Sequence, residues 1–394
     1  MIVARKEGSM RKYLLIPGPT PIPPRVSKAR QRPMIGHRSP EYGEILKRVV
    51  ENLKYVFQTE NDVLIFSSSG TGGMEASIVN LLSPGDKAIA LAGGAFGERF
   101  VKILVSFGIE VIPLRCEWKE VVDPKLVAKE LDRDRDIRAV FVTLLETSTG
   151  VKNDVKSLGK ICKERKTLLV VDAISGLGIE ELKTDDWGVD VVISASQKGL
   201  MTPPGLSFIS ISERAWEAGE RSRIYRFYWD FKTYREFLER GQPPYTPPVS
   251  LVFGLDEALR MIKEEGMEKV WERQKRLART TREGIKGLGL ELLAMGNYSN
   301  GVTAIKVPEN IDGLKLLKVL REKYGVTLAG GQERLKGKIF RIGHMGYIQF
   351  KDILVALGAL ERTLLSLGHR LKKGEAIKRA KEANVETQKI KSNQ

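Results

Sequence analysis

Between residues 60 and 212 the chain repeats one pattern, in which a short apolar run is followed by a helical stretch. Runs such as DVLIF (62–66) and KAIALA (87–92) have the length of buried strands, and GERFVKILVSFG (97–108) has the periodicity of a helix. Strands that alternate with helices favour a doubly wound, mostly parallel sheet with helices on both faces. The other apolar runs, which bring the expected α/β sheet to seven strands, are 110–114, 137–145, 167–173, 189–196 and 206–212.

The pattern changes after residue 250. A long helical stretch over 251–289 leads to a smaller region that mixes apolar strands with helices, which predicts a second, α+β domain. We therefore expect an N-terminal arm (1–30), a large domain (31–270) with a loop near 240–250, a small C-terminal domain (271–371) and a basic tail (372–394).

Charge alone raises the hypothesis of nucleic-acid binding. The net charge is +16 and the pI about 9.6. The basic residues are spread along the chain, however, and the densest patch is the segment from Arg370 onward, with eight Lys or Arg against three Glu. A solvated helix with a loose basic end accounts for that patch without a partner. A non-catalytic scaffold that binds nucleic acid through this tail is the alternative from a different functional class.

Cysteine and histidine usage points to a cytoplasmic protein without a metal centre. Two cysteines give no disulfide framework, and three histidines form no HExxH or comparable metal-binding pattern. The start of the sequence has no apolar signal-peptide region, and no run is long enough for a membrane span. The heavy use of Lys, Arg and Glu is typical of a thermophilic source.

Polar residues follow several of the expected strands, where ligands bind in an open parallel sheet. After 62–66 comes SSSGTGGMEA, a glycine-rich turn entering a helix, which is suited to a phosphate but has neither the Walker nor the GxGxxG spacing. The other strand ends carry ETSTG (146–150), Asp172 and Lys198. A buried carboxylate needs a donor or cation, and a buried lysine has a lowered pKa.

Each piece also has a structural interpretation, as a capped helix, a turn or a surface lysine. Together they match what pyridoxal phosphate requires: a lysine for a Schiff base, an acid for the pyridine nitrogen and a helix N-terminus for the phosphate.

Longer segments give a specific resemblance. VVDAISGLG and SASQKGLMTPPGLSF, which places Lys198 26 residues after Asp172, resemble the class V, fold-type-I pyridoxal-phosphate enzymes, and among them the alanine–glyoxylate / serine–pyruvate aminotransferases. LLIPGPTPIPPRV, RPMIGHRSPEY, ETSTGV, TPPVSL and KIFRIGHMG match in the same order over nearly the whole chain. The resemblance implies a homodimer that binds pyridoxal phosphate. It also implies ping-pong transamination through a Schiff base, from serine or alanine to glyoxylate or pyruvate.

The resemblance also implies roles for single residues. Lys198 carries the cofactor and moves the substrate proton, Asp172 pairs with the pyridine nitrogen, and Arg341 receives the substrate α-carboxylate as a bidentate fork. Phe96 stacks on the ring and Thr147 lies near its phenolic oxygen. The phosphate is held by Ser69, Gly70, Thr71 and Gln197, Ile174 contacts the cofactor, Pro17 and Gly18 line the substrate entrance, and Thr246 reaches the phosphate of the partner subunit. The sequence departs from the family at Pro243, a position at which the family often has a tyrosine. Tyr245 is the substitute for that tyrosine as a cofactor contact across the subunits.

Other class V enzymes remain alternatives. A cysteine desulfurase needs a nucleophilic thiol over the cofactor, but Cys116 follows a strand and Cys162 lies inside a helix. Aspartate- or phosphoserine-type aminotransferases share the lysine and aspartate, and a dicarboxylate donor needs a second cation, for which Arg38 is the candidate. The expected substrate pocket is bounded by Phe96, Tyr245 and the proline-rich N-terminal turn. Little room is left in it, which favours small donors.

Overall fold

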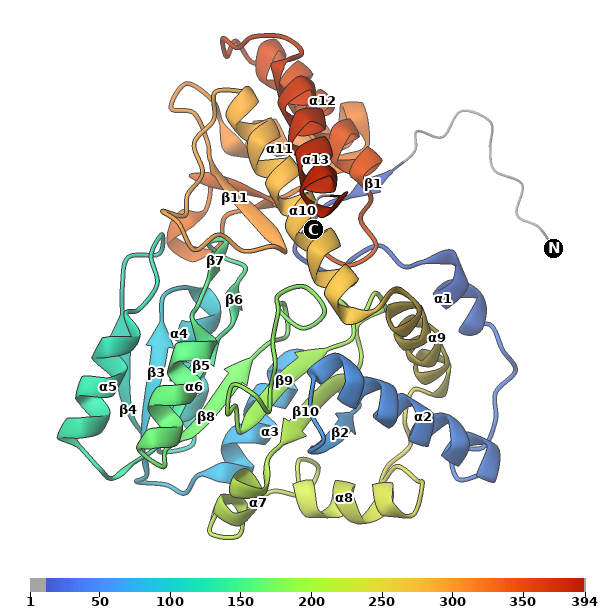
Figure 1. Cartoon of the computed structure of the whole chain (residues 1–394), viewed down its shortest axis with the longest axis vertical. Coiled ribbons are helices and arrows are strands. Elements are labelled where there is room, and N and C mark those ends of the chain that lie inside the picture. The colour runs from blue at the N-terminus through green and yellow to red at the C-terminus, as the bar shows by residue number, and fades with distance from the viewer. Residues whose placement is uncertain (1–11, 393–394) are drawn as a thin grey trace.

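A seven-stranded sheet forms the centre of the computed structural model, which describes residues 12–392 (Figure 1). Every strand runs parallel to the others except β10, which is antiparallel to both of its neighbours. The predicted fold class and strand number are confirmed. In spatial order the strands are β2 (Asp62–Phe66), β10 (Ser207–Ile211), β9 (Val191–Ala195), β8 (Leu168–Asp172), β5 (Ile137–Thr143), β3 (Lys87–Ala92) and β4 (Glu110–Arg115).

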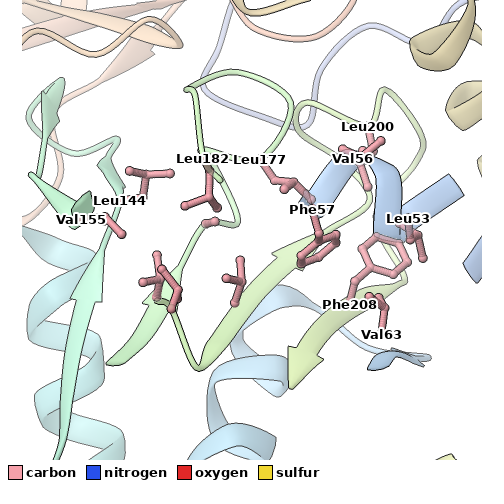
Figure 2. Packing of buried hydrophobic residues seen from close by; sticks show 14 of the residues in the cluster. Leu53, Val56, Phe57, Val63, Leu144, Val155, Leu177, Leu182, Leu200 and Phe208 are labelled. Carbon is pink, nitrogen blue, oxygen red and sulfur yellow. The ribbon is translucent and has the colours of Figure 1, made fainter. Parts of the chain in front are cut away.

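Helices cover both faces of this sheet because alternate side chains of each strand point to opposite faces. In β8, Leu169 and Val171 belong to one buried cluster, whereas Leu168 and Val170 belong to another. Figure 2 shows Phe57 and Phe208 in the first cluster. The helices that contribute buried residues to the first cluster are α2 (Pro40–Phe57), α5 (Pro124–Arg133), α6 (Val155–Glu164) and α9 (Val249–Glu265). Those that contribute to the second are α3 (Gly70–Leu81), α4 (Ala95–Ser106), α7 (Glu213–Gly219) and α8 (Phe231–Glu239).

The C-terminal region has its own hydrophobic core. β1 (Tyr13–Leu14) pairs with β12 (Val326–Thr327), so the N-terminal segment joins this region and Leu15 lies in its core. The domain boundaries at residues 30, 270 and 371 stay predictions. The other elements of the region are β11 (Val302–Lys306), β13 (Ala329–Gly330), β14 (Ile339–Gly343), α10 (Met267–Gly287), α11 (Gly313–Tyr324) and α12 (Phe350–Ser366). In the part of the chain described, no helix is long and apolar enough to cross a membrane.

The long helical stretch expected over 251–289 is two helices. α9 ends at Glu265 and α10 begins at Met267, because Gly266 between them has φ +86°. Glycine adopts this backbone conformation without the steric penalty that a side chain would bring. The hydrophobic periodicity continues through the break, which is why the sequence pattern did not reveal it.

The basic tail is not fully solvated, in contrast to what its charge suggested. Residues Glu375–Ser392 form α13, which packs against α10, and Ala376 and Ala380 belong to the core of the C-terminal region. Gly287 permits this close approach, since a side chain there would meet the Ala376 backbone at 2.8 Å. The alanines bury one face of α13, and the neighbouring lysines occupy exposed positions.

Candidate active site

The polar segments predicted from the sequence meet at one edge of the sheet, because the six parallel strands end there. β9, β8 and β5 are direct neighbours, so the ends of adjacent strands carry Lys198, Asp172 and the 146–150 turn. The glycine-rich turn after β2 is separated from the lysine turn by one strand, since β10 lies between β2 and β9. The helix α3 after that turn nevertheless packs against β9.

Lys198 lies in the turn after β9, beneath the N-terminal segment. Its Nζ donates a hydrogen bond to the carbonyl oxygen of Pro17. Thr20 fixes the same turn, because its N–H donates to the Gln197 carbonyl at 3.0 Å and its Oγ1 to the Lys198 carbonyl at 3.0 Å. Gly18 has φ +105°, and a side chain there would lie 2.6 Å from Lys198 Cε. The structure therefore brings the predicted Gly18 and Lys198 into direct contact.

Burial changes the acidity of this lysine. Loss of hydration lowers the pKa of Lys198 to about 8, and the Arg341 and Arg99 charges act in the same direction, whereas Asp172 opposes them. Part of the lysine population is therefore a neutral amine at neutral pH, the form that attacks a carbonyl carbon.

Asp172 is the last residue of β8 and is 2% exposed. Its Oδ1 accepts a hydrogen bond from the Ile174 N–H at 2.8 Å, and Oδ2 has no partner within residues 12–392. Loss of hydration raises the pKa of Asp172 to about 7, with a further rise from Glu146 and an opposing effect of Lys198. A protonated ring nitrogen would supply the missing partner and stabilise the carboxylate.

The N-terminus of α3 has the properties of an anion site. Ser69 makes no capping hydrogen bond, and the N–H groups of Gly70 and Thr71 have no acceptor among the residues described. Gly70 packs closely on Ile174, since a side chain at Gly70 would meet Ile174 Cγ1 at 2.8 Å. Gln197, which precedes Lys198, has a buried Oε1 without a hydrogen-bond partner among the described residues, and its Nε2 is the group that can donate to an anion. Free N–H groups at a helix N-terminus are suited to a phosphate.

Arg341 comes from β14 of the C-terminal region and is 6% exposed. Its Nη1 donates to the Thr147 carbonyl at 2.8 Å and to Gln332 Oε1 at 3.1 Å, and its Nε donates to the Gly330 carbonyl at 2.9 Å. No carboxylate of the described residues lies within ion-pair distance of the guanidinium. Burial lowers the pKa of Arg341 to about 10, and the charge of Glu146 opposes this from a greater distance. A buried cation without an ion-pair partner favours an anionic ligand.

Glu146 is a site residue that sequence reasoning overlooked. Its carboxylate is 3% exposed and accepts hydrogen bonds from the N–H groups of Phe96 (3.0 Å) and Gly97 (3.1 Å), at the first turn of α4. Its other oxygen accepts from the N–H and the hydroxyl of Ser148, whose Oγ in turn accepts from the Ala95 N–H at 3.0 Å. The carboxylate in ETSTG was the available signal. Its partners on a distant helix were not visible in the sequence.

Arg99 is the second residue that was missed. It lies one turn after Phe96 on α4, donates to Thr71 Oγ1 at 3.0 Å, and has its guanidinium 4.7 Å from the Phe96 ring centroid. Arg38, named as a second cation from the sequence, instead donates to Gln242 Oε1 at 2.9 Å and to the Pro244 carbonyl at 3.2 Å.

Two predicted cofactor residues lie outside this cluster within one chain. Tyr245 stacks on Tyr228, with ring centroids 5.2 Å apart, and its hydroxyl donates to the Phe227 carbonyl at 3.3 Å. Thr246 beside it is exposed. Neither side chain forms a hydrogen bond with Lys198, whose Nζ donates to the Pro17 carbonyl oxygen.

The cysteines have the properties of packing residues. Cys162 is buried in α6, and burial raises the pKa of its thiol to about 12; the pKa of the half-buried Cys116 is also raised by burial. Thiolates are the reactive form, so neither position favours a nucleophile. Among residues 12–392 no group of three or more His, Cys, Asp or Glu is arranged to hold a metal ion.

The sequence profile of the family described as Aminotransferase class-V matches residues 12–349. The chain belongs to the class V aminotransferases. These enzymes use pyridoxal phosphate, which is therefore the cofactor of this protein, and the edge described above fits it. Three groups match three parts of the cofactor. The free N–H groups of α3 suit the phosphate, Oδ2 of Asp172 suits the ring nitrogen, and the Lys198 amine suits the aldehyde.

Several named relatives align over almost their whole length. A "Soluble hydrogenase 42 kDa subunit" from Anabaena cylindrica is 41% identical over 90% of this chain and 94% of that protein. An L-aspartate–glyoxylate aminotransferase from Paracoccus denitrificans is 37% identical (94% and 95% covered), and a serine–glyoxylate aminotransferase from Methylorubrum extorquens is 35% identical (96% and 96%). The crystal structure of an alanine–glyoxylate aminotransferase from Nostoc sp. superposes with a TM-score of 0.87 at 31% identity, covering 92% and 98% of the two chains.

Proposed function

We propose that this class V aminotransferase transfers the amino group of a small 2-amino acid, serine or alanine, to glyoxylate or pyruvate. The observation that carries the proposal is Arg341, a buried guanidinium without a carboxylate partner among the described residues, whose charge reaches Lys198. Every amino donor and oxo-acid acceptor of the reaction has the carboxylate that this cation lacks. Because the Nε and Nη1 hydrogens of Arg341 already bind Gly330, Thr147 and Gln332, its Nη2 is the donor left for this carboxylate.

Pyridoxal phosphate supplies an aldehyde that condenses with amines and a ring that withdraws electrons. Lys198 acts first as the neutral amine that holds the cofactor and then, once displaced, as the base that moves the proton of the substrate α-carbon. Its lowered pKa supports both tasks, since a base works best when its pKa lies near the working pH. Asp172 keeps the ring nitrogen protonated, and Arg341 orients the substrate so that its α-hydrogen faces Lys198.

The remaining cofactor contacts belong to the same proposal. The N–H groups of Gly70 and Thr71, with Ser69 and Gln197, hold the phosphate. Phe96 and Ile174 pack against the ring, and Thr147 lies near its oxygen. Two hydrogen bonds support this assignment. The Phe96 N–H donates to the Glu146 carboxylate, and Arg341 donates to the Thr147 carbonyl, so both residues are held near the strand ends.

We extend the proposal to a cytoplasmic homodimer from a thermophilic source. Tyr225 (102% exposed) and Phe227 (79%) form an apolar surface beside Tyr245, suited to a partner subunit. Both cysteines are free, which supports a reducing compartment. Arg25 bridges Glu257 and Glu264 at 2.7 Å each, an ion-pair network of the kind that stabilises proteins at high temperature.

Donor preference tests the proposed substrate. We expect kcat/KM for serine or alanine, with glyoxylate as acceptor, to exceed kcat/KM for aspartate and glutamate. The physical reason is that a second carboxylate must be desolvated in a pocket where Arg341 already serves the first. The measurement compares the four donors on one preparation, with glyoxylate and with pyruvate. A preference for aspartate or glutamate of about tenfold, or 1.4 kcal/mol of transition-state stabilisation, contradicts the small-donor proposal and supports aspartate-type transamination.

A further inference from the structure

Among the described residues Arg99 has no carboxylate partner, although it is partly buried. Its Nη1 donates to Thr71 Oγ1 at 3.0 Å, and no acid of the described residues lies within ion-pair distance. The guanidinium lies over the Phe96 ring, 4.7 Å from its centroid. A hydrogen bond to Thr71 and a cation–π contact with Phe96 therefore hold its position. Its charge also lowers the pKa values of Lys198 and Asp172.

The phosphate cradle next to Arg99 lacks positive charge of its own. Ser69, Gly70, Thr71 and Gln197 are neutral, and Lys198 is committed to the aldehyde end of the cofactor. A phosphate monoester carries a charge of nearly −2 at neutral pH, since its second pKa is about 6. A helix N-terminus offers only about half a positive charge. Most of the phosphate charge therefore needs another counter-charge.

Thr71 connects the cation to the cradle. Its Oγ1 accepts from Arg99 and keeps its own hydrogen for a further acceptor. Its backbone N–H at the start of α3 has no acceptor among the described residues. The same residue thus presents two donors to an anion while its hydroxyl oxygen touches the guanidinium.

We propose that Arg99 is the counter-charge of the cofactor phosphate, acting on the anion at the α3 N-terminus directly and through the Thr71 hydroxyl. The inference rests on the cofactor site proposed above. It adds a cation that is held by α4 and stacked on the ring-binding Phe96. One helix then positions both the residue that packs on the cofactor ring and the charge that binds its phosphate.

The experiment compares two ligands that differ only in the phosphate. The dissociation constants of pyridoxal phosphate and of pyridoxal are measured by absorbance titration of the full-length apoprotein, for the wild type and for Arg99→Gln. Lys102→Gln is the matched control, because Lys102 lies on the same helix, is exposed, and is 3.8 Å from Glu333. We expect Arg99→Gln to weaken pyridoxal phosphate binding by about tenfold or more and pyridoxal binding by less than about threefold, with neither changed in the control.

Equal weakening of both ligands overturns the proposal, because it assigns Arg99 to the support of Phe96 alone. Unchanged pyridoxal phosphate affinity with a selective loss of kcat/KM for aspartate also overturns it, and assigns Arg99 to a donor side chain. A wild-type protein that does not bind pyridoxal phosphate contradicts the proposed cofactor site itself, and with it the role of Arg99.

A measurement on the wild type covers the case in which Arg99→Gln does not fold. Modification of Arg99 by phenylglyoxal, followed by peptide mapping, should be slowed by pyridoxal phosphate and by inorganic phosphate but not by pyridoxal. Protection by pyridoxal to the same extent as by pyridoxal phosphate contradicts the proposal.

Discussion

At the scale of single residues, the lowered pKa of Lys198 gives a prediction about pH. Only the neutral amine attacks an aldehyde, so the rate of cofactor capture rises with pH through the lysine pKa and is constant above it. Because burial lowers that pKa to about 8 from 10.5, we expect the capture rate to reach its plateau below about pH 9.5. Stopped-flow absorbance with apoprotein and pyridoxal phosphate measures this profile.

The variant Asp172→Asn tests the direction in which the Asp172 charge changes the pKa of Lys198. The Asp172 charge raises the pKa of Lys198, so its removal should move the midpoint of the profile to lower pH. A wild-type rate that still increases above pH 10 contradicts the prediction, since that behaviour belongs to a lysine exposed to water.

Residues at strand ends were accessible to sequence reasoning because topology alone brings them together. Lys198 and Asp172 follow strands that are neighbours in the sheet, so their meeting required only the parallel order. Glu146 and Arg99 depend on where the first turn of α4 lies relative to other loops. That placement is decided by tertiary packing, which no local pattern encodes.

At the scale of elements, Glu146 ties α4 to the end of β5 and gives the next prediction. In Glu146→Gln the side chain keeps its shape, but an amide N–H₂ faces backbone donors on one side. Each hydrogen bond to a charged group contributes about 1.5–3 kcal/mol, so the first turn of α4 should shift and carry Phe96 with it. We expect a weaker visible circular dichroism signal of the bound cofactor and a fall of roughly tenfold in kcat.

Ser148→Ala is the milder comparison, because it removes one hydroxyl and leaves the Phe96 and Gly97 N–H groups bonded to Glu146. Its cofactor spectrum should remain close to that of the wild type. Unchanged dichroism and kcat in Glu146→Gln, with the variant folded, would show that this carboxylate does not position Phe96.

Elements were predicted well where periodicity and end signals agreed. In α5 (Pro124–Arg133) both kinds of signal stand in the sequence, because Asp123 caps the helix with its side chain and a proline is its first residue. The break at Gly266 and the packing of α13 escaped prediction for opposite reasons. Gly266 interrupts a helix without changing its apolar pattern, and α13 buries small alanines between lysines, so its apolar face is narrow.

At the scale of the whole molecule, the site combines parts from distant regions. Arg341 comes from the C-terminal region and the Thr147 carbonyl from a turn that follows β5 of the large sheet, so the proposed substrate-binding cation depends on how the two regions pack. Thr246 lies outside this assembly in a single chain, beside the exposed aromatic surface. If a second copy covers that surface, Thr246 reaches the partner's phosphate.

Mixed dimers test this arrangement. Lys198→Ala and Thr246→Ala should each be impaired as homodimers, the second through weaker cofactor binding. A hybrid holds one site that combines Lys198 of one protomer with Thr246 of the other, so refolding the two variants together should restore activity. With random pairing, about a quarter of all sites are intact. Activity is measured on hybrids isolated with two affinity tags. Hybrids no more active than the average of the two homodimers would place Thr246 in the site of its own chain, because the protomer with Lys198 would then still carry alanine at 246.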